Sequence, residues 1–143
     1  MAIQRVSPAE AKRLLDEGYL YLDVRTEPEF AAGHPAGAQN VPVMLPGPRG
    51  MTPNPEFLTV VEAAYPKDAK IVVGCRSGVR SMRAAEMMIA AGYQNIVDQR
   101  AGFEGPRDAF GAVQEPGWAA AGLPVEGLTP GGAYGEVKAK AGL

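Results

Sequence analysis

Short apolar runs along the chain alternate with longer stretches whose apolar residues recur at helical spacing. The strongest run is KIVVG at residues 70–74, which has no polar residue after its lysine. Such a run is typical of a central parallel strand that is buried on both faces. Two further runs, YLYLDV at 19–24 and NIVD at 95–98, are rich in β-branched or aromatic residues and carry an acidic residue at or near the end. The pattern therefore predicts three strands.

Capping residues mark the beginnings of helices between these strands. Ser7, Pro8 and Glu10 form the pattern of a capping box with proline in the first turn, and Gly18 is a typical C-terminal stop. Comparable start and stop signals predict four helices, over residues 8–17, 26–32, 54–65 and 81–91. Strands that alternate with capped helices are typical of an open α/β sheet, whose parallel strands are joined by right-handed crossovers.

Proline and glycine interrupt this pattern in two places. Residues 42–55 contain five prolines and two glycines, which predicts a stiff irregular loop. Both residue types become frequent again after Ala101. At 143 residues the chain has the length of one domain. We expect this domain over residues 1–126 and a C-terminal tail over 127–143, where 133–140 forms either a terminal helix or part of a disordered segment.

Composition and charge exclude several classes of function. The net charge is -2 and lysine and arginine are scattered, so we expect no nucleic-acid partner. One cysteine and one histidine are too few for a zinc site with Cys and His ligands, so we expect no metal. A single cysteine cannot form an internal disulfide, and an isolated thiol is typical of a reducing compartment. The first residues contain no apolar signal-peptide core and no run is long enough to cross a bilayer. These features predict a cytoplasmic protein without a membrane partner.

The single cysteine, Cys75, follows the strand at 70–74 and precedes the helix predicted from Ser81. Ligands of open α/β sheets bind beyond the carboxyl ends of the strands, where Cys75 lies. The positive end of the helix and two nearby arginines, Arg76 and Arg80, favour a reactive thiolate. The alternative is a buried packing residue, which most single cysteines are. The two arginines and Gly78 favour the reactive thiol, because a packing residue at a strand end needs neither.

The spacing of Cys75 and Arg80 limits the kinds of group that the loop between them can bind. Four residues separate them, one fewer than in the phosphate-binding C-x5-R loop of protein tyrosine phosphatases. A tighter loop suits one additional sulfur atom on the cysteine better than a tetrahedral phosphate. The short loop therefore disfavours a phosphatase or an arsenate reductase of related fold.

The loop CRSGVRS at residues 75–81 resembles the active-site loop of single-domain rhodaneses, which are thiosulfate-type sulfurtransferases. Other segments follow the same family's signature. They are DVRTEPEF at 23–30, GH at 33–34, GAQNVP at 37–42, AGF at 101–103, and Trp118 with GLP at 122–124. The resemblance covers about residues 4–126 and is closest to the small plant and bacterial members.

This resemblance implies a rhodanese-like open parallel sheet flanked by helices on both faces. It also implies a transferase that needs no cofactor. Cys75 would take a sulfane sulfur from thiosulfate or a related anion as a persulfide and pass it to cyanide or to a thiol, such as glutathione or thioredoxin. A mercaptopyruvate enzyme is less favoured, because that branch has a C-G-S-G-V-[ST] loop. In another class of function, the domain would be a sulfur carrier or persulfide-binding module that works with a partner protein.

The resemblance also assigns roles within the loop. Backbone N–H groups from Arg76 to Ser81 would form an anion cradle around the sulfur; the loop residues are Arg76, Ser77, Gly78, Val79, Arg80 and Ser81. Arg76 would attract the anionic donor, and Arg25 is the second candidate for its oxygens. Gly78 is expected to have a positive φ.

We expect several other residues to have structural roles. Arg80 either contacts substrate or pairs with Asp23 or Glu29, and these two acidic residues are expected to support the loop. We expect His34 to be a hydrogen-bonded structural residue and not a general base.

The chain also departs from the family pattern. Pro35 follows His34, Ala101 replaces the first glycine of a G-G turn, and residues 104–117 form an insertion before Trp118. The insertion and the tail lie where they would alter access of an acceptor.

Overall fold

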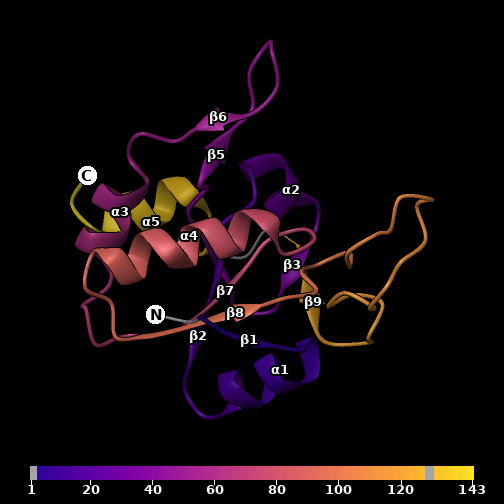
Figure 1. Cartoon of the computed structure of the whole chain (residues 1–143). Helices are drawn as coiled ribbons and strands as arrows, with labels where there is room; N and C mark the ends of the chain where they lie inside the picture. Colours follow the sequence, from indigo (N-terminus) through magenta and orange to yellow (C-terminus); the bar gives the residue numbers. More distant parts are fainter. Residues whose placement is uncertain (1–2, 128–130) are drawn as a thin grey trace.

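Five parallel strands form the central sheet of the computed structural model, which describes residues 3–127 and 131–143 (Figure 1). Their spatial order is β1-β8-β7-β2-β4. The strands are β1 (Gln4–Val6), β2 (Leu20–Asp23), β4 (Gln39–Asn40), β7 (Lys70–Gly74) and β8 (Asn95–Gln99). The open α/β sheet expected from the sequence is confirmed, with β7 at its centre as the apolar run KIVVG predicts.

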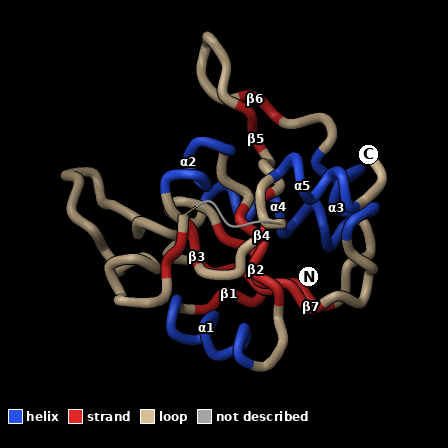
Figure 2. Tube along the Cα trace, turned by 180° about the vertical axis from the view of Figure 1, so that it is seen from behind, coloured by secondary structure: helices blue, strands red, loops and turns tan. Residues whose placement is uncertain are grey.

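Helices cover both faces of this sheet. They are α1 (Pro8–Asp16), α2 (Glu27–Ala32), α3 (Phe57–Ala64), α4 (Val79–Ala90) and α5 (Tyr134–Lys140). Figures 1 and 2 show α1 on one face and α3, α4 and α5 on the other. Among the described residues, no helix combines the length and the apolar character that crossing a membrane requires.

The central strand β7 is buried on both faces after Lys70, and its consecutive side chains point to opposite layers. Val72 joins the hydrophobic cluster of Ala11 and Trp118 on the α1 side. Its neighbours Ile71 and Val73 join the other cluster, on the side of α3 and α4. All three strand residues are fully buried. The continuous apolar run in the sequence is thus explained by two cores that share one strand.

The predicted caps begin the first two helices. Ser7 and Glu10 form a reciprocal capping box before α1, and Thr26 and Glu29 form another before α2. The helix α4 begins two residues earlier than the sequence predicts, because Gly78 has a left-handed conformation and serves as its N-cap.

Besides β1 and β4, four short strands were not among the three predicted strands. The strands β3 (His34–Pro35) and β9 (Val125–Glu126) pair with each other, and β5 (Met44–Leu45) pairs with β6 (Thr52–Pro53) within the proline-rich loop. Two residues are too few to show an alternating pattern. The hairpin of β5 and β6 projects from the body of the fold in Figure 1.

Within the tail, α5 packs against α3 and β4. Its Tyr134 and Val137 are buried in the same hydrophobic cluster as α3 and α4. The backbone N–H of Asn40 donates to the carbonyl of Gly132 at 2.8 Å. Of the two alternatives for residues 133–140, the structure has the helix; residues 128–130 of the tail lie outside the described residues.

Candidate active site

Cys75 lies at the carboxyl end of β7, and only 2% of its surface is exposed. The loop that follows turns back over the sulfur before α4 begins. The backbone N–H of Gly78 donates to Cys75 Sγ at 3.1 Å, and the thiol donates to the Ser81 hydroxyl at 3.4 Å. The loop of residues 75–81 therefore turns past the sulfur and directs one backbone donor, the Gly78 N–H, at it, at the N-terminus of a helix.

Gly78 has the conformation that the sequence predicts. Its φ is +99°, in the left-handed region that favours glycine. A Cβ atom at this position would overlap the backbone carbonyl oxygen of Arg100. In addition, Nη2 of Arg5 donates to the Gly78 carbonyl at 3.2 Å. Gly78, whose N–H points at the sulfur, is thus held in place through its carbonyl and by close packing on Arg100.

The A-G-F turn supports the loop from the other side. The N–H of Phe103 donates to the carbonyl of Cys75 at 2.8 Å, and that of Glu104 donates to the carbonyl of Arg76 at 2.9 Å. A side chain on Gly102 would overlap the backbone of Arg76. The second glycine of the turn is therefore the one that close packing requires, and Ala101 fits at the first position, fully buried.

Arg76 extends from the loop toward solvent. Its side chain is 55% exposed, and its Nε pairs with a carboxylate oxygen of Glu104 at 2.8 Å. Glu104 is the first residue of the insertion at 104–117. The insertion thus partly neutralises a cation at the edge of the loop.

Unlike Arg76, Arg80 forms a bidentate ion pair with Glu29. Its Nη1 and Nη2 donate to the two carboxylate oxygens at 2.7 and 3.0 Å. Burial raises the pKa of Glu29, but hydrogen bonds from Arg80 and Thr26 outweigh it and lower the pKa to about 2. Of the two partners expected from the sequence, Glu29 is the one that the structure pairs with Arg80.

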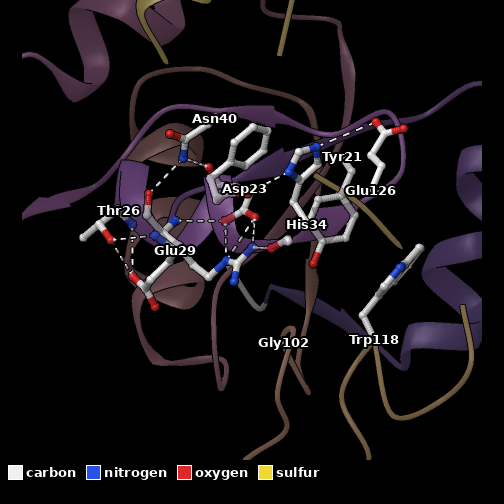
Figure 3. A network of polar contacts seen from close by, with 12 residues as sticks. Tyr21, Asp23, Thr26, Glu29, His34, Asn40, Gly102, Trp118 and Glu126 are labelled. Carbon is white, nitrogen blue, oxygen red and sulfur yellow. Dashed lines mark hydrogen bonds and ion pairs between the residues drawn. The ribbon is translucent and has the colours of Figure 1, made fainter. Parts of the chain in front are cut away.

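Asp23, which Figure 3 labels within a network of polar contacts, instead pairs with Arg25. Nε and Nη2 of Arg25 donate to the Asp23 carboxylate at 3.0 and 2.7 Å, and Nη2 also donates to the carbonyl of Gly33 at 2.7 Å. The Arg25 side chain is 3% exposed and lies 4.4 Å from the centre of the Phe103 ring. These contacts are those of a structural residue, and an anion-binding role for Arg25 stays a prediction.

His34 lies fully buried beside this network (Figure 3). Its Nδ1 lies 2.8 Å from the carbonyl of Phe30, and its ring stacks on the Phe30 ring with 3.6 Å between the centroids. Its Nε2 lies 3.7 Å from a carboxylate oxygen of Glu126. These contacts support the expected structural role.

Two residues that support the loop were missed in the sequence. Asp98 ends the run predicted as a strand, is fully buried, and accepts from Nε of Arg5 at 2.6 Å. Asp98 could have been predicted as a site residue, because it is an acidic residue at the carboxyl end of a buried strand, like Asp23. Arg5 lies in β1, for which the sequence offered no signal.

Among residues 3–127 and 131–143, no group of three or more His, Cys, Asp and Glu side chains is arranged to hold a metal ion.

The family model of the rhodanese-like domain matches residues 7–108. The chain belongs to the rhodanese-like domain family. It is 40% identical over 121 residues to "Thiosulfate sulfurtransferase 16, chloroplastic" of Arabidopsis thaliana, with 85% of this chain and 91% of the relative covered. The crystal structure of Rv0390 from M. tuberculosis superposes with a TM-score of 0.74 at 30% identity and covers 88% of this chain and 98% of that one.

Other members of the rhodanese-like family differ in size and in the function that their names state. "Rhodanese-like domain-containing protein 15, chloroplastic" of Arabidopsis thaliana is 43% identical over 93 residues. The match covers 65% of this chain and 51% of that protein, so about half of that relative lies outside it. Its name states the domain and no enzyme activity.

The insertion of this rhodanese-like chain lies beside the sulfur loop. A pocket of about 440 Å³ is lined by Ser77, Gly78 and Val79 of the loop, and also by Pro106 and Glu115 of the insertion. Val79 is 77% exposed. Figure 1 shows the insertion as a long loop that projects from the body of the fold. The insertion therefore contributes to the surface next to the loop of residues 75–81.

Proposed function

We propose that this chain is a thiosulfate-type sulfurtransferase in which Cys75 carries the sulfur as a persulfide. The observation that carries the proposal is the loop of residues 75–81, whose Gly78 N–H points at a buried cysteine sulfur at 3.1 Å. The plant relative named a thiosulfate sulfurtransferase supports it, since that protein is matched over 91% of its length. The short spacing, with four residues between Cys75 and Arg80, suits one added sulfur atom better than a phosphate.

The proposed reaction has two steps. The Cys75 thiolate attacks the outer sulfur of thiosulfate, the S–S bond of the donor breaks, and sulfite leaves with the electron pair of that bond. The product is a Cys75 persulfide anion, which Gly78 N–H and the N-terminus of α4 stabilise. A thiol acceptor, with glutathione and thioredoxin as candidates, or cyanide then takes the outer sulfur and releases the Cys75 thiolate. This is covalent, ping-pong catalysis.

A second candidate is a sulfur carrier that holds the persulfide for a partner protein. The relative whose name states only the rhodanese-like domain favours this alternative. The two functions share the persulfide and differ in how fast small acceptors remove it. A cytoplasmic location also stays a prediction, because both of these plant relatives are named chloroplastic.

Intact-mass measurement after thiosulfate treatment tests the proposal. The protein is expected to gain the mass of one sulfur atom, and Cys75→Ala is expected to gain none. Addition of cyanide or glutathione is expected to remove the adduct rapidly. Absence of the adduct contradicts sulfur transfer from thiosulfate, and an adduct that both acceptors remove only slowly supports the carrier.

Arg76→Ala is expected to raise the KM for thiosulfate about fivefold, because a half-exposed cation contributes about 1 kcal/mol to anion binding. Steady-state kinetics with thiosulfate and cyanide measures this. Glu104→Gln is the matched opposite variant, since it removes the carboxylate that neutralises Arg76, and it is expected to lower the KM. Unchanged KM values in both variants would place the donor site elsewhere, with Arg25 next to be tested.

A further inference from the structure

The insertion at residues 104–117 exposes the side chain of Phe110 almost completely. This phenylalanine is 97% exposed, whereas the other three phenylalanines of the chain are buried or partly buried. The fold therefore gains nothing from this ring. A single exposed apolar residue is common in proteins, so the surroundings of Phe110 decide what it is for. They are described below relative to the sulfur loop, residues 75–81.

The turn that carries Phe110 is held by hydrogen bonds. The carboxylate of Asp108 accepts the N–H groups of Phe110 and Ala112 at 2.8 and 3.0 Å. Nη1 of Arg107 donates to the carbonyl of Gly111 at 2.7 Å. An ordered turn thus holds the ring out in the solvent. A partner that covered the ring would lose little binding energy to the ordering of this turn.

Two ion pairs join the base of the insertion to the rest of the fold. Glu104 pairs with Arg76 of the sulfur loop at 2.8 Å, and Glu115 pairs with Arg100, which follows β8, at 2.9 Å. The two sides of the insertion also lie against each other, because a Cβ atom on Gly105 would overlap the carbonyl oxygen of Glu115. These contacts set the position of the insertion relative to the sulfur loop.

The surface that the insertion offers is apolar. Each of its charged residues has a partner within the chain: the two glutamates form the ion pairs above, and Arg107 and Asp108 hold the turn. Phe110 and Val113, which is 44% exposed, remain available to a partner. On the sulfur loop, Val79 is 77% exposed and lines the same pocket as the base of the insertion. Exposed apolar side chains therefore lie on both sides of this pocket.

We propose that the insertion is a docking arm for a protein that takes the sulfur from Cys75, and that Phe110 is its apolar anchor. The partner is a protein thiol whose reactive cysteine is bordered by uncharged, apolar surface, because the docking arm leaves no charge without a partner. This inference rests on the proposed function and names the class of its acceptor. In the step itself, the partner's thiolate attacks the outer sulfur of the Cys75 persulfide. The S–S bond breaks, its electron pair leaves with the Cys75 thiolate, and the partner holds the new persulfide.

The position of Phe110 favours a protein over a small acceptor. The pocket beside the sulfur loop is lined by the base of the docking arm, Pro106 and Glu115, and Phe110 is not among its lining residues. The arm projects from the body of the fold (Figure 1). A cyanide ion or a glutathione molecule at the sulfur loop would therefore leave the ring in solvent, whereas a protein surface spans both.

Phe110→Ser tests the anchor with thiosulfate as donor and reduced thioredoxin as the protein thiol. We expect kcat/KM for thioredoxin to fall about tenfold, as for an aromatic anchor that a partner covers. The kinetics with cyanide and with glutathione are expected to stay unchanged. Leu143→Ser, at a 58% exposed position beyond α5, is the matched control and is expected to change neither. An unchanged kcat/KM for thioredoxin in Phe110→Ser, or an equal fall with glutathione, would overturn the proposal.

Salt concentration separates apolar docking from attraction between charges. At saturating thiosulfate, kcat/KM of the wild type for thioredoxin is expected to change less than about twofold between about 0.05 and 0.5 M salt, since salt screens charges and not apolar contact. A steep fall with salt would assign docking to charged groups and would contradict the apolar anchor.

NMR spectroscopy tests docking without sulfur transfer. In isotope-labelled protein without a sulfur donor, reduced thioredoxin is expected to shift the amide signals of residues 107–113 and to leave those of α5 unchanged. The shifts are expected to disappear in Phe110→Ser, and their absence from the wild type would overturn the proposal. Gel filtration covers a second copy as the occupant. A wild-type dimer that Phe110→Ser converts to a monomer, with unchanged thioredoxin kinetics, would assign the ring to that contact and overturn the proposal.

The docking arm and the proposed function can fail separately. The NMR shifts need no sulfur donor, and persulfide formation with turnover by cyanide needs no protein partner. Loss of the thioredoxin effects with intact cyanide turnover would reject only the docking arm. Shifts in residues 107–113 without a persulfide from thiosulfate would reject only thiosulfate as donor.

Discussion

Gly78→Ala is expected to destabilise the protein by about 2–4 kcal/mol and to abolish persulfide formation. A positive φ alone costs an L-residue about 1–2 kcal/mol. The added Cβ would also overlap the carbonyl oxygen of Arg100, which follows β8 and cannot move without disturbing the sheet. Relief of this overlap would turn the Gly78 N–H away from the sulfur. Urea unfolding and the mass measurement after thiosulfate treatment test the two effects.

Gly111→Ala is the matched control. Gly111 has a similar positive φ of +84° in the insertion, but a Cβ there would meet no atom within 4 Å. We expect it to lose only about 1 kcal/mol and to keep persulfide formation. Equal losses of stability in both variants, with sulfur uptake intact, would mean that the contact between the loop and Arg100 is unimportant.

The sequence predicts the centre of the fold well because there the local signals and the tertiary structure agree. The run at residues 70–74 becomes β7 without a change of bounds, since its apolar residues are needed on both faces of the sheet. The positive φ of Gly78 can also be predicted from the sequence, because glycine is the residue that suits a reversal of the chain directly after a strand and before a helix. Because Cys75 directly follows the run at residues 70–74, the sequence also places it at the carboxyl edge of the sheet.

The contacts that hold the site in place are harder to predict from the sequence, because they join distant parts of the chain. The pair of Arg80 with Glu29 joins residues 51 positions apart, and both Asp23 and Glu29 were possible partners before the structure was known. The contact of Arg5 with Asp98 spans 93 positions and depends on β1 lying next to β8. A three-residue strand has too weak a pattern to predict that neighbour.

The ion pair of Glu29 and Arg80 leads to the second large effect, which depends on pH. Glu29→Gln is expected to lower the free energy of unfolding by about 2 kcal/mol at neutral pH, after allowance for the partial exposure of the pair. Glutamine still completes the capping box with Thr26, so the variant removes the charge and keeps the cap. The partly buried Arg80 is left without its counter-charge.

The sign of the pH dependence follows from the depressed pKa. Glu29 has a pKa of about 2 in the folded protein and 4.5 as its ordinary value. The stabilisation is therefore fully present above pH 4.5 and is lost as the pH falls toward 2. The difference in unfolding free energy between wild type and Glu29→Gln is expected to shrink across this window, as measured by urea unfolding at several pH values.

Glu62→Gln is the matched control for an ion pair of similar length. Glu62 pairs with Lys67 at 2.6 Å, but the two side chains are 44% and 41% exposed, so the expected loss is below about 0.5 kcal/mol. If Glu29→Gln behaved like Glu62→Gln, or if its difference from the wild type stayed constant from neutral pH to pH 2, the pair with Arg80 would not stabilise the loop. Because Arg80 lies in the loop that surrounds Cys75, loss of the pair is also expected to slow sulfur uptake from thiosulfate.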